Sequence, residues 1–459
     1  MKMSLQEIAK AVNAEILNKN DQDITVEEVS FDSRKIGVNS LFIPLKGEQD
    51  GHKFIESAIN NGAVATFFEN KSEFEIPKNI PILKVENALE SLQKLSRYYL
   101  KKINPEVIAI TGSNGKTTTK DMVASVLSTK FNVTKTNGNF NNEIGVPITI
   151  LSMKPSTETL VVEFGMDRPG QLNFLSKLVQ PDVAIITMIG EAHIEFFKTR
   201  DKIADAKMEI TNALKTQSFF IYNGDEHLLN DRAKNLNDIL IRTFGKNTDN
   251  NLYSTSIHKE KFNTLFTTNK YADFEFEIPM IGEYNVNNAL AAIMVGDLYE
   301  IKKEDIKSAL KSFDLTENRT EWIIGAKDEK ILSDVYNSNP TAVKNVLNAF
   351  VAEPTNGHKI IVLGDMLELG DASAELHKGL ANDINPAEIK SVYLIGNEIL
   401  PLYNQLKNKY AISDIHYYKK DDMDSLYHDL NDEIEPKDYV LLKGSHGIHL
   451  EKLLDMLKK

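Results

Sequence analysis

Short runs of apolar residues alternate with helical patterns along most of this chain. In the middle of the chain, three such runs each stop at a glycine or a polar loop, at residues 107–110, 159–164 and 182–187. Near-continuous apolar runs of this length are typical of parallel strands that are buried on both faces. The pattern therefore predicts an α/β domain built on a parallel sheet.

A second alternation begins after about residue 315. Its expected strands are residues 330–335, 359–363, 391–395 and 439–442, and its expected helices include residues 341–350 and 447–457. Strands that alternate with helices in this way predict a separate, doubly wound, Rossmann-like domain.

The first hundred residues mix short strands, such as 40–44, with short helices, such as 54–60. Residues 101–105 read Lys-Lys-Ile-Asn-Pro, and we interpret this charged segment, closed by a proline, as a linker. We therefore expect an α/β protein of three domains: an N-terminal α/β domain at 1–104, a central parallel-sheet domain at 105–315 and a C-terminal domain at 316–459.

Composition narrows the class of protein. The chain is 42% hydrophobic and 26% charged, as globular proteins are, and its net charge of −13 argues against a nucleic-acid partner. It has no cysteine, which excludes disulfides and thiolate metal ligands. No apolar run approaches the ~18 residues of a membrane span, so we expect no membrane insertion. The expectation is a cytoplasmic protein that acts as a monomer.

A glycine-rich turn follows the first strand of the central domain. The strand at 107–110 leads into Gly112-x-x-Gly115-Lys116-Thr117, and an apolar helical stripe follows. Strand, glycine loop, Lys-Thr and helix together are typical of a nucleotide-triphosphate site, in which loop amides and the lysine meet the phosphates and the threonine meets Mg²⁺. The loop is shorter than the common G-x-x-x-x-G-K-[ST] pattern, so an ordinary glycine turn is the alternative.

Two polar residues follow the other central strands. Glu163 ends the run at 159–164 and His193 lies just past the run at 182–187, so both are expected at the carboxyl edge of the sheet. A carboxylate there could hold Mg²⁺ beside Thr117, while a solvent-exposed glutamate is the plainer interpretation. For His193, a packed or capping residue and a ligand are equally good interpretations from position alone.

Lys207 lies in a helical pattern at 200–214 and borders its apolar stripe. A buried lysine loses its proton easily, and a neutral amine can take up CO₂ to give an anionic carbamate. From periodicity alone, a lysine that extends past apolar neighbours to solvent is the better interpretation.

These motifs together resemble the Mur ligases, which build the peptide of bacterial peptidoglycan. The run 111–118 is similar to their ATP loop, and Glu163, His193 and Lys207 fall at matching positions. The resemblance implies ATP and Mg²⁺ as cofactors and catalytic roles for Lys116, Lys207 and His193. The implied metal ligands are Thr117, Glu163, His193 and a carbamylated Lys207. The implied ATP-binding residues are Gly112, Ser113, Asn114, Gly115, Lys116, Thr117, Thr118, Asn288 at the adenine, Arg319 at the phosphates and Asp334 at the ribose.

Further motifs are similar to the branch of the family that adds D-alanyl-D-alanine to UDP-N-acetylmuramoyl-tripeptide. They include segments at 32–34, 46–52, 141–145, 336–340 and 363–370. The implied partners are these two substrates, with the UDP portion in the N-terminal domain, and the implied process is cell-wall synthesis and thereby cell shape and division. The implied substrate-binding residues are Ser33, Arg34, Lys46, Gly47, Asp50, His52, Thr136, Asn141, Asn142, Tyr336, Asn337 and Asn339. The Asp-Asn-Pro-Arg motif of the branch that adds a diamino acid is absent.

One position departs from the family pattern. His446, in Lys443-Gly444-Ser445-His446, stands where the family usually has arginine, and the permanent charge and fork of arginine are lost there. Two alternatives remain. A folylpolyglutamate synthase would share the mechanism but not the N-terminal domain, and an ATPase that drives motion would not need Glu163, His193 and Lys207 together.

Overall fold

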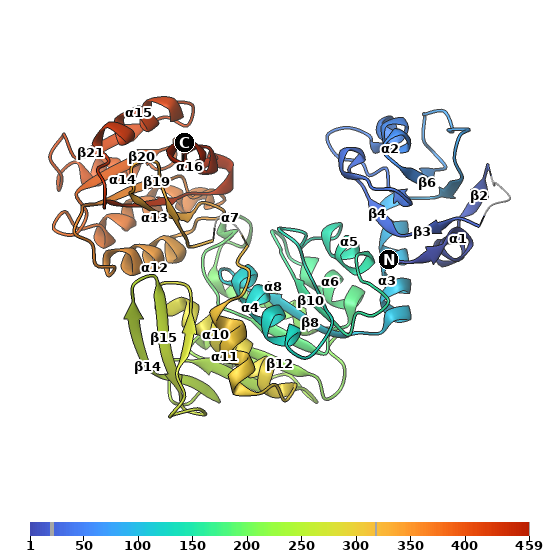
Figure 1. Cartoon of the computed structure of the whole chain (residues 1–459), viewed down its shortest axis with the longest axis horizontal. Coiled ribbons are helices and arrows are strands. Elements are labelled where there is room, and N and C mark those ends of the chain that lie inside the picture. Colours follow the sequence, from blue (N-terminus) through green and yellow to red (C-terminus); the bar gives the residue numbers. More distant parts are fainter. Residues whose placement is uncertain (19–22, 317–318, 459) are drawn as a thin grey trace.

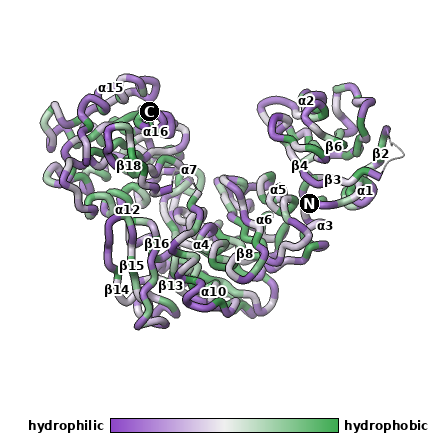
Figure 2. Tube along the Cα trace, in the orientation of Figure 1, coloured by the Kyte–Doolittle hydropathy of each residue, from purple (hydrophilic) through white to green (hydrophobic). Residues whose placement is uncertain are grey.

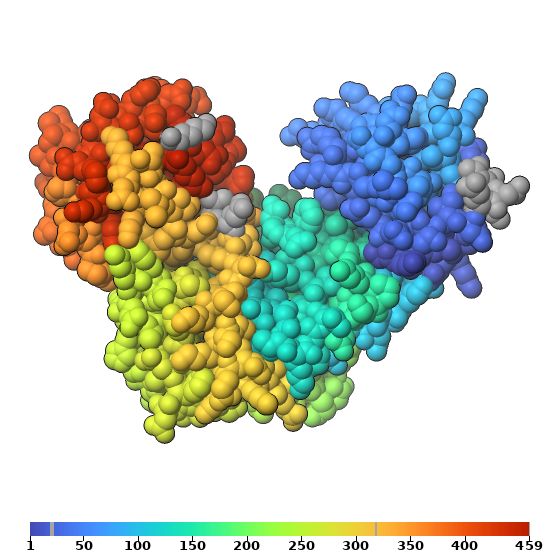
Figure 3. Space-filling view, in the orientation of Figure 1, coloured from blue at the N-terminus to red at the C-terminus, as the bar shows by residue number. Residues whose placement is uncertain are grey.

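The computed structural model describes residues 1–18, 23–316 and 319–458. Three lobes follow one another along the chain (Figure 1). The central lobe contacts both others, whereas the space-filling view shows an open space between the N-terminal and C-terminal lobes (Figure 3). The predicted α/β class and the three-domain architecture are confirmed.

The N-terminal lobe is a small sheet with helices packed on it. Its five strands run in the order β2-β7-β6-β5-β4, and a separate antiparallel pair joins β1 to β3. The strands are β1 (Met3–Ser4), β2 (Glu15–Leu17), β3 (Thr25–Val26), β4 (Glu28–Ser30), β5 (Ser40–Phe42), β6 (Ala63–Glu69) and β7 (Ile82–Val85). The short helices are α1 (Leu5–Val12) and α2 (Ile55–Asn60), so the expected strand at 40–44 and helix at 54–60 are both present.

The prediction of a linker at 101–105 is wrong. Helix α3 (Ala88–Ile103) continues through both lysines and ends only at Asn104, which is left-handed with φ 53°. The two lysines lie in its last turn, where positive charge is favourable beside the helix dipole, and Pro105 follows. The Tyr99 hydroxyl donates to the Met153 carbonyl at 3.0 Å. A helix packed against the central domain therefore joins the first two lobes.

The central lobe is built on a nine-stranded sheet, in the order β16-β15-β14-β13-β12-β11-β8-β10-β9. Strands β8 to β14 pair in parallel with their neighbours, and β14, β15 and β16 pair antiparallel. The strands are β8 (Glu106–Thr111), β9 (Val133–Lys135), β10 (Thr159–Glu163), β11 (Val183–Ile186), β12 (Phe219–Asn223), β13 (Leu240–Gly245), β14 (Leu252–Glu260), β15 (Asn263–Thr268) and β16 (Phe276–Ile278). The three predicted apolar runs form β8, β10 and β11.

Helices cover both faces of this sheet. They are α4 (Lys116–Ser128), α5 (Gly145–Leu151), α6 (Gln171–Val179), α7 (Ile194–Phe197), α8 (Arg200–Met208), α9 (His227–Ala233), α10 (Glu283–Leu298) and α11 (Lys303–Lys311). The helix expected at 200–214 is shorter than predicted, because a 3₁₀ turn at Glu209–Thr211 replaces its last part.

The C-terminal lobe is a six-stranded sheet in the order β17-β18-β22-β19-β20-β21, parallel except for β17. Its strands are β17 (Glu321–Ile324), β18 (Lys330–Asp334), β19 (Lys359–Gly364), β20 (Ser391–Ile395), β21 (Ile415–Tyr418) and β22 (Tyr439–Lys443). Its helices are α12 (Pro340–Val351), α13 (Ser373–Gly379), α14 (Leu400–Leu406), α15 (Met423–Glu433) and α16 (Leu450–Leu457). The last helix begins later than expected, after a 3₁₀ turn at His446–Ile448.

Apolar residues gather on the strands inside each lobe and polar residues on the outside (Figure 2). In the central lobe, one buried cluster lies on each face of the sheet, and one of them continues into the N-terminal lobe. Within the part of the chain that the structure describes, no helix is both long enough and apolar enough to span a membrane.

An aromatic contact fastens the β14–β15 hairpin of the central lobe to the C-terminal lobe. Phe262 at the hairpin turn lies 4.9 Å from the ring of Trp322 and 6.2 Å from the ring of Tyr439. Trp322 and Tyr439 also contact each other at 5.2 Å, edge to face. Such ring pairs stabilise an interface beyond the area that they bury.

We predict that Phe262→Ala loosens this contact. The free energy of unfolding should fall by about 1 to 3 kcal/mol, because an aromatic side chain is removed from a packed contact. The chain has a single tryptophan, so the fluorescence of Trp322 reports on this interface and should shift to longer wavelength. Ile412→Ala, at a side chain 90% exposed, is the control. An unchanged spectrum and urea midpoint for Phe262→Ala would show that the contact does not hold the lobes together.

Candidate active site at the domain junction

The glycine-rich turn lies between β8 and α4, at the carboxyl edge of the central sheet. Gly115 has φ 81° and precedes the first residue of α4. A β-carbon on Gly115 would lie 2.5 Å from Asn288 Oδ1 on α10, and one on Gly112 would lie 1.8 Å from the Thr187 hydroxyl. Both positions therefore require glycine, because neighbouring side chains press against the turn.

Lys116 bends back over this turn. Its Nζ donates to the Gly112 carbonyl at 2.9 Å and to the Ser113 carbonyl at 3.4 Å. Burial lowers the pKa of Lys116, and the Glu163 carboxylate opposes that change. The amine thus lies over the mouth of the loop, where the terminal phosphates of a bound nucleotide would come.

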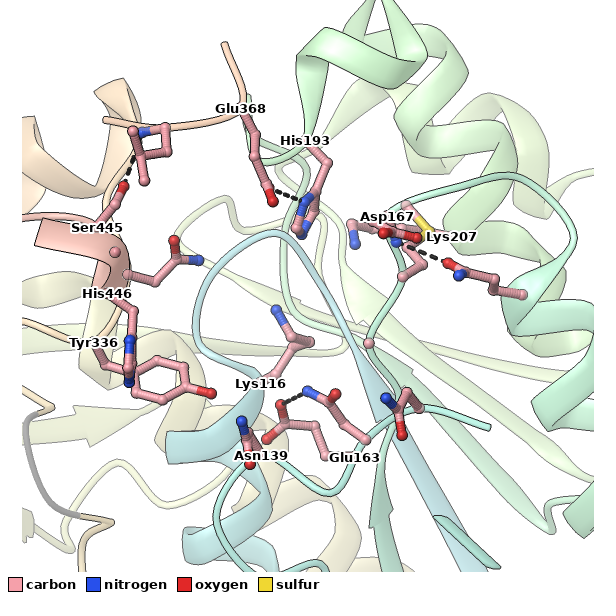
Figure 4. A pocket seen from close by; sticks show the side chains of 18 of the residues that line it. Lys116, Asn139, Glu163, Asp167, His193, Lys207, Tyr336, Glu368, Ser445 and His446 are labelled. Carbon is pink, nitrogen blue, oxygen red and sulfur yellow. Dashed lines mark hydrogen bonds and ion pairs between the residues drawn. The ribbon is translucent and has the colours of Figure 1, made fainter. Parts of the chain in front are cut away.

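A cavity of about 540 Å³ opens where the central lobe meets the C-terminal lobe (Figure 4). Many separate segments contribute to its lining, which includes Lys116, Glu163, His193, Lys207 and Arg319. The structure thus brings together the five predicted residues from which the chemistry was argued.

Glu163 is held rigidly at the end of β10. It is 2% exposed, its backbone N–H donates to the Thr136 hydroxyl, and its Oε1 accepts from Asn141 Nδ2 at 2.8 Å. Its second oxygen, Oε2, is buried on the cavity wall with no hydrogen-bond partner among the described residues. A buried carboxylate oxygen without a partner is costly, so this atom suits a cation.

Lys207 on α8 is buried, at 2% exposure, and pairs with no carboxylate of the described chain. Desolvation lowers its pKa well below the usual range, and the nearby charge of Lys116 lowers it further. The interpretation as a lysine that reaches solvent is therefore wrong, because α8 turns this side chain inward onto the cavity. An uncharged amine is the form that can react with CO₂.

His193 and Glu368 close the top of the cavity from opposite lobes (Figure 4). His193 Nδ1 lies 2.5 Å from Glu368 Oε2, at an angle that is poor for a hydrogen bond. The backbone reinforces this junction, because the Glu195 N–H donates to the Glu368 carbonyl at 3.1 Å. Within the described residues, no group of three or more acidic or histidine side chains could hold a metal on its own.

A smaller cavity of about 70 Å³ lies on the other side of the glycine turn. Its wall includes Thr118, Asn288, Asp334 and Lys443, and Arg319 lines both cavities. The Lys443 ammonium lies 2.6 Å from Asp334 Oδ2, and Asn288 Oδ1 accepts from the Thr119 hydroxyl at 3.2 Å. The predicted nucleoside contacts Asn288 and Asp334 are thus brought together, behind the predicted phosphate contacts.

Two contacts tie this region to the C-terminal lobe. Asn114 and Asn339 exchange side-chain hydrogen bonds at 2.7 and 3.2 Å. The Arg319 guanidinium lies 3.9 Å from the ring centre of Tyr336 and donates to the Thr117 hydroxyl at 3.3 Å. His446 packs edge to face against Tyr336 at 5.7 Å, so the histidine that replaces the usual arginine lines the same cavity.

Several predicted substrate contacts use their polar groups within the protein. The Thr136 hydroxyl accepts from the Glu163 N–H, and the Thr136 carbonyl accepts from Lys120. Asn142 Oδ1 accepts from the N–H of Gly145, the first residue of α5, and Asn337 Oδ1 accepts from the Ser338 N–H. Asn141, Asn142 and Asn337 nonetheless line the large cavity. These side chains shape the wall, and their roles toward a substrate stay predictions.

The remaining candidates lie in the N-terminal lobe, away from the cavity. His52 is buried, with Nδ1 2.6 Å from Asp50 and Nε2 accepting from the Glu69 N–H, so both ring nitrogens are occupied. Lys46 pairs with Glu69 at 2.8 Å beside Gly47, and Ser33 is buried. Arg34 is 84% exposed and pairs with Asp32 through two hydrogen bonds.

Sequence patterns missed part of the cavity wall. Six further polar residues line it: Asn139, Glu143, Asp167, Gln171, Glu368 and Ser445. Asp167 Oδ1 is buried without a partner, and Ser445 accepts from the Leu367 N–H at 2.9 Å. Glu143, Glu368 and Ser445 lie within segments singled out for their motifs, at 141–145, 363–370 and 443–446, so those motifs were the available signal. For Asn139, Asp167 and Gln171, the sequence offered no such signal.

Comparisons with known proteins match this architecture over all three lobes. Family models match as follows: "Mur ligase family, catalytic domain" at residues 25–100, "Mur ligase middle domain" at 110–296 and "Mur ligase, glutamate ligase domain" at 318–446. The chain is 38% identical over 456 residues to the UDP-N-acetylmuramoyl-tripeptide–D-alanyl-D-alanine ligase of Bacillus subtilis, covering 99% of this chain and 98% of the relative.

Solved structures of related proteins match the fold of this chain over nearly its whole length. A crystal structure of MurF from Acinetobacter baumannii superimposes with a TM-score of 0.86 at 27% identity, covering 100% of this chain and 99% of the other. MurF from Thermotoga maritima in complex with ADP gives a TM-score of 0.80 at 29% identity, covering 94% and 97%.

We predict that Gly115→Ala weakens nucleotide binding by at least about tenfold, because the new methyl group meets Asn288 and the backbone is left-handed. Gly170→Ala is a matched control. Gly170 also precedes a helix and has φ 88°, but a β-carbon there would meet no atom within 4 Å. Titration of ADP against both variants separates the steric effect from the backbone effect. Equal weakening by both substitutions would contradict the proposed close fit at Gly115.

Proposed function

The chain belongs to the Mur ligase family, and we propose that it joins D-alanyl-D-alanine to UDP-N-acetylmuramoyl-tripeptide with cleavage of ATP to ADP and phosphate. The product would be the pentapeptide precursor of peptidoglycan, so the enzyme would serve cell-wall synthesis and thereby cell shape and division. The observation that carries the proposal is the convergence of Lys116, Glu163, Lys207 and Arg319 on one cavity between two lobes, in a chain that matches such a ligase from end to end.

The proposed chemistry has two steps. First, a carboxylate oxygen of the tripeptide attacks the γ-phosphorus of ATP, the bond to ADP breaks, and an acyl phosphate forms. Second, the free amine of the dipeptide attacks the acyl carbon, the amide bond forms, and phosphate leaves as the amine gives up a proton. Lys116, the loop amides and Arg319 would offset the negative charge on the transferring phosphoryl group.

Each lobe has a separate part in this proposal. The N-terminal lobe, at 1–104, would hold the UDP portion, with Arg34 as an exposed cation for it. The central lobe, at 105–315, would hold ATP between the glycine turn and Asn288. The C-terminal lobe, at 316–459, would complete the ATP site with Arg319 and Asp334 and accept the dipeptide beside Tyr336, Asn337 and His446. Bringing three substrates together in one place lowers the entropic barrier to reaction.

The residues present fit Mg²⁺. The partnerless Glu163 Oε2 is an oxygen donor at the cavity, and His193 reaches it from the opposite edge. The Thr117 hydroxyl does not line the cavity but accepts from Arg319, which does, so it is a second oxygen close to it. Mg²⁺ is commonly held by one or two protein oxygens together with substrate phosphates and water, so the small number of protein ligands suits it. The ion would neutralise charge on the phosphates of ATP.

We also propose that Lys207 is carbamylated. It is buried, its pKa is lowered, and it has no carboxylate partner in the described chain. A carbamate would turn a costly buried cation into an anion, and the positive side chains around the cavity would stabilise that anion.

We continue to expect a monomer. We also expect it in the cytoplasm, because ATP and nucleotide-linked sugars are cytoplasmic compounds. The two alternatives make different predictions. A folylpolyglutamate synthase would elongate a folate, and an ATPase that drives motion would hydrolyse ATP without either substrate.

The decisive test is reconstitution. The protein is incubated with ATP, Mg²⁺, UDP-N-acetylmuramoyl-tripeptide and D-alanyl-D-alanine, and the pentapeptide is sought by mass spectrometry. ADP release should require both co-substrates. ATP hydrolysis that continues at the same rate without either of them would contradict the proposal.

We predict that Lys116→Ala folds normally and loses activity by a factor of about 10² to 10³, because a cation that meets the developing charge is removed. Circular dichroism checks the fold and ADP release measures the rate. Near-normal ligation by a folded Lys116→Ala protein would exclude this role.

We predict that Lys207→Ala also loses most activity and that acetate, but not the neutral acetamide, partly restores it. Acetate supplies the anionic oxygens that a carbamate would place in the same space. Lys207→Arg keeps the positive charge and cannot form the carbamate, so it should stay inactive with or without acetate. Full activity of Lys207→Arg would show that Lys207 has no role as a carbamate and serves only in packing.

A further inference from the structure

A second cavity of about 330 Å³ opens beside the large one, on the side that faces the N-terminal lobe. The two cavities share a wall made by Asn142, Glu143, Gly165 and Gln171. The far wall of the second cavity includes Gln93 of α3, the helix that joins the first two lobes. A substrate that reaches from the N-terminal lobe to the glycine turn would therefore pass this opening.

The lining of this second cavity combines an apolar surface with negative charge. Pro169, Phe174 and Leu175 supply the apolar part. Glu143 supplies the charge, and its carboxylate forms no ion pair with any described residue, while Gln93 Nε2 holds its backbone carbonyl at 3.1 Å. Among the described residues that line the cavity, none is a lysine, arginine or histidine.

A second carboxylate lies behind the same wall. Glu209 accepts hydrogen bonds from the Gly170 N–H at 2.8 and 3.0 Å and from the Asn173 N–H at 3.1 Å. The cavity is therefore adapted to an apolar chain that ends in a positive charge, and it opposes a negative one.

The covalent structure of the proposed substrate says which group comes here. The carboxylate that reacts belongs to the third residue of the tripeptide, and that residue's side chain leaves from the carbon next to the carboxyl carbon. When the carboxylate lies at Lys116, the side chain must enter a space adjoining the large cavity. The second cavity adjoins it.

We infer that the second cavity binds the side chain of the third residue and selects one that ends in an ammonium group alone. This inference rests on the proposed function. The four methylenes of a lysine side chain lie against Phe174 and Leu175, and the ammonium meets Glu143. A diaminopimelate side chain adds a carboxylate at the same end, next to Glu143 and without a cation to receive it. Glu143 is thus a specificity-determining residue.

Three substrates test the inference. UDP-N-acetylmuramoyl-tripeptides are prepared with L-lysine, with meso-diaminopimelate and with meso-diaminopimelate whose distal carboxyl group is amidated. We expect kcat/KM to be at least about tenfold lower for diaminopimelate than for lysine, the usual scale of one charged contact, and amidation to restore most of the difference.

The outcomes separate the inference from the proposed function. Equal kcat/KM for lysine and diaminopimelate, or a preference for diaminopimelate, overturns the inference and leaves the ligase intact. If the amidated substrate is as poor as the charged one, size rather than charge is selected, and the inference is again wrong. No ligation with any of the three overturns the proposed function and the inference with it.

Variants localise the effect. Glu143→Gln should raise KM for the lysine substrate about tenfold, with little change in kcat or in KM for ATP. It should also reduce the difference in kcat/KM between the lysine and diaminopimelate substrates. Glu304→Gln removes a carboxylate on the exposed surface of α11, which lines neither cavity, and should change none of these values.

A gain-of-function variant covers the case in which Glu143→Gln does not fold. Gln93→Lys adds a cation to the far wall and should shift the preference toward diaminopimelate. An unchanged preference in a folded Gln93→Lys protein would contradict the electrostatic argument.

Discussion

Lys116 and Lys207 share one cavity, and their positive charges repel each other in surroundings that water reaches poorly. The pKa of both is lowered, and the charge of Lys116 contributes to the shift at Lys207. Arg319 adds a third positive group to the same wall, and Glu163 supplies a buried negative one. A cavity of this kind favours anions, as the proposed phosphates, substrate carboxylate and Lys207 carbamate all are. The second cavity has the opposite charge, and the two lie side by side, so one substrate can present a carboxylate to the first and an ammonium to the second.

The contacts that hold the lobes around this cavity include neutral pairs and pairs with one or two charged partners, such as His193 with Glu368. An exchanged pair of amides joins Asn114 to Asn339, a ring contact joins Phe262 to Trp322, and Glu191 Oε2 accepts from the Thr341 hydroxyl at 2.6 Å. A neutral hydrogen bond, such as the amide pair, contributes only about 1 kcal/mol, and one to a carboxylate about 1.5 to 3 kcal/mol. An interface of this kind can separate and re-form at modest cost, as an enzyme that must admit three substrates and release three products requires. The N-terminal lobe is attached differently, by a continuous buried cluster along α3.

The sequence correctly predicted those parts of the structure that depend on residues close to one another along the chain. The glycine turn, the strands β8, β10 and β11 and most of the C-terminal strands follow from apolar runs that end at polar residues. The prediction of a linker at 101–105 was wrong because the outcome there depends on residues far away in the sequence. Its lysines and proline are typical of a linker, but lysines are also favoured in the last turn of a helix, and only the packing of Tyr99 against the central lobe shows which applies. The burial of Lys207 also depends on distant packing, because its periodicity fits either a buried or a solvent-reaching side chain. Asp167 and the pairing of His193 with Glu368 depend on the approach of segments far apart in sequence, for which no local pattern exists.

His446 shows how far a substituted residue can keep a site intact. Its ring packs edge to face against Tyr336, and the Arg319 guanidinium lies 3.9 Å from the centre of the same tyrosine ring. His446 also packs against His449 at 5.8 Å, so two histidines and a tyrosine form one aromatic group on the C-terminal wall. An arginine at 446 would bring a second permanent cation to the ring that already receives Arg319. With histidine there, the aromatic contact is kept without that repulsion, and Arg319 is the guanidinium beside Tyr336 on this wall.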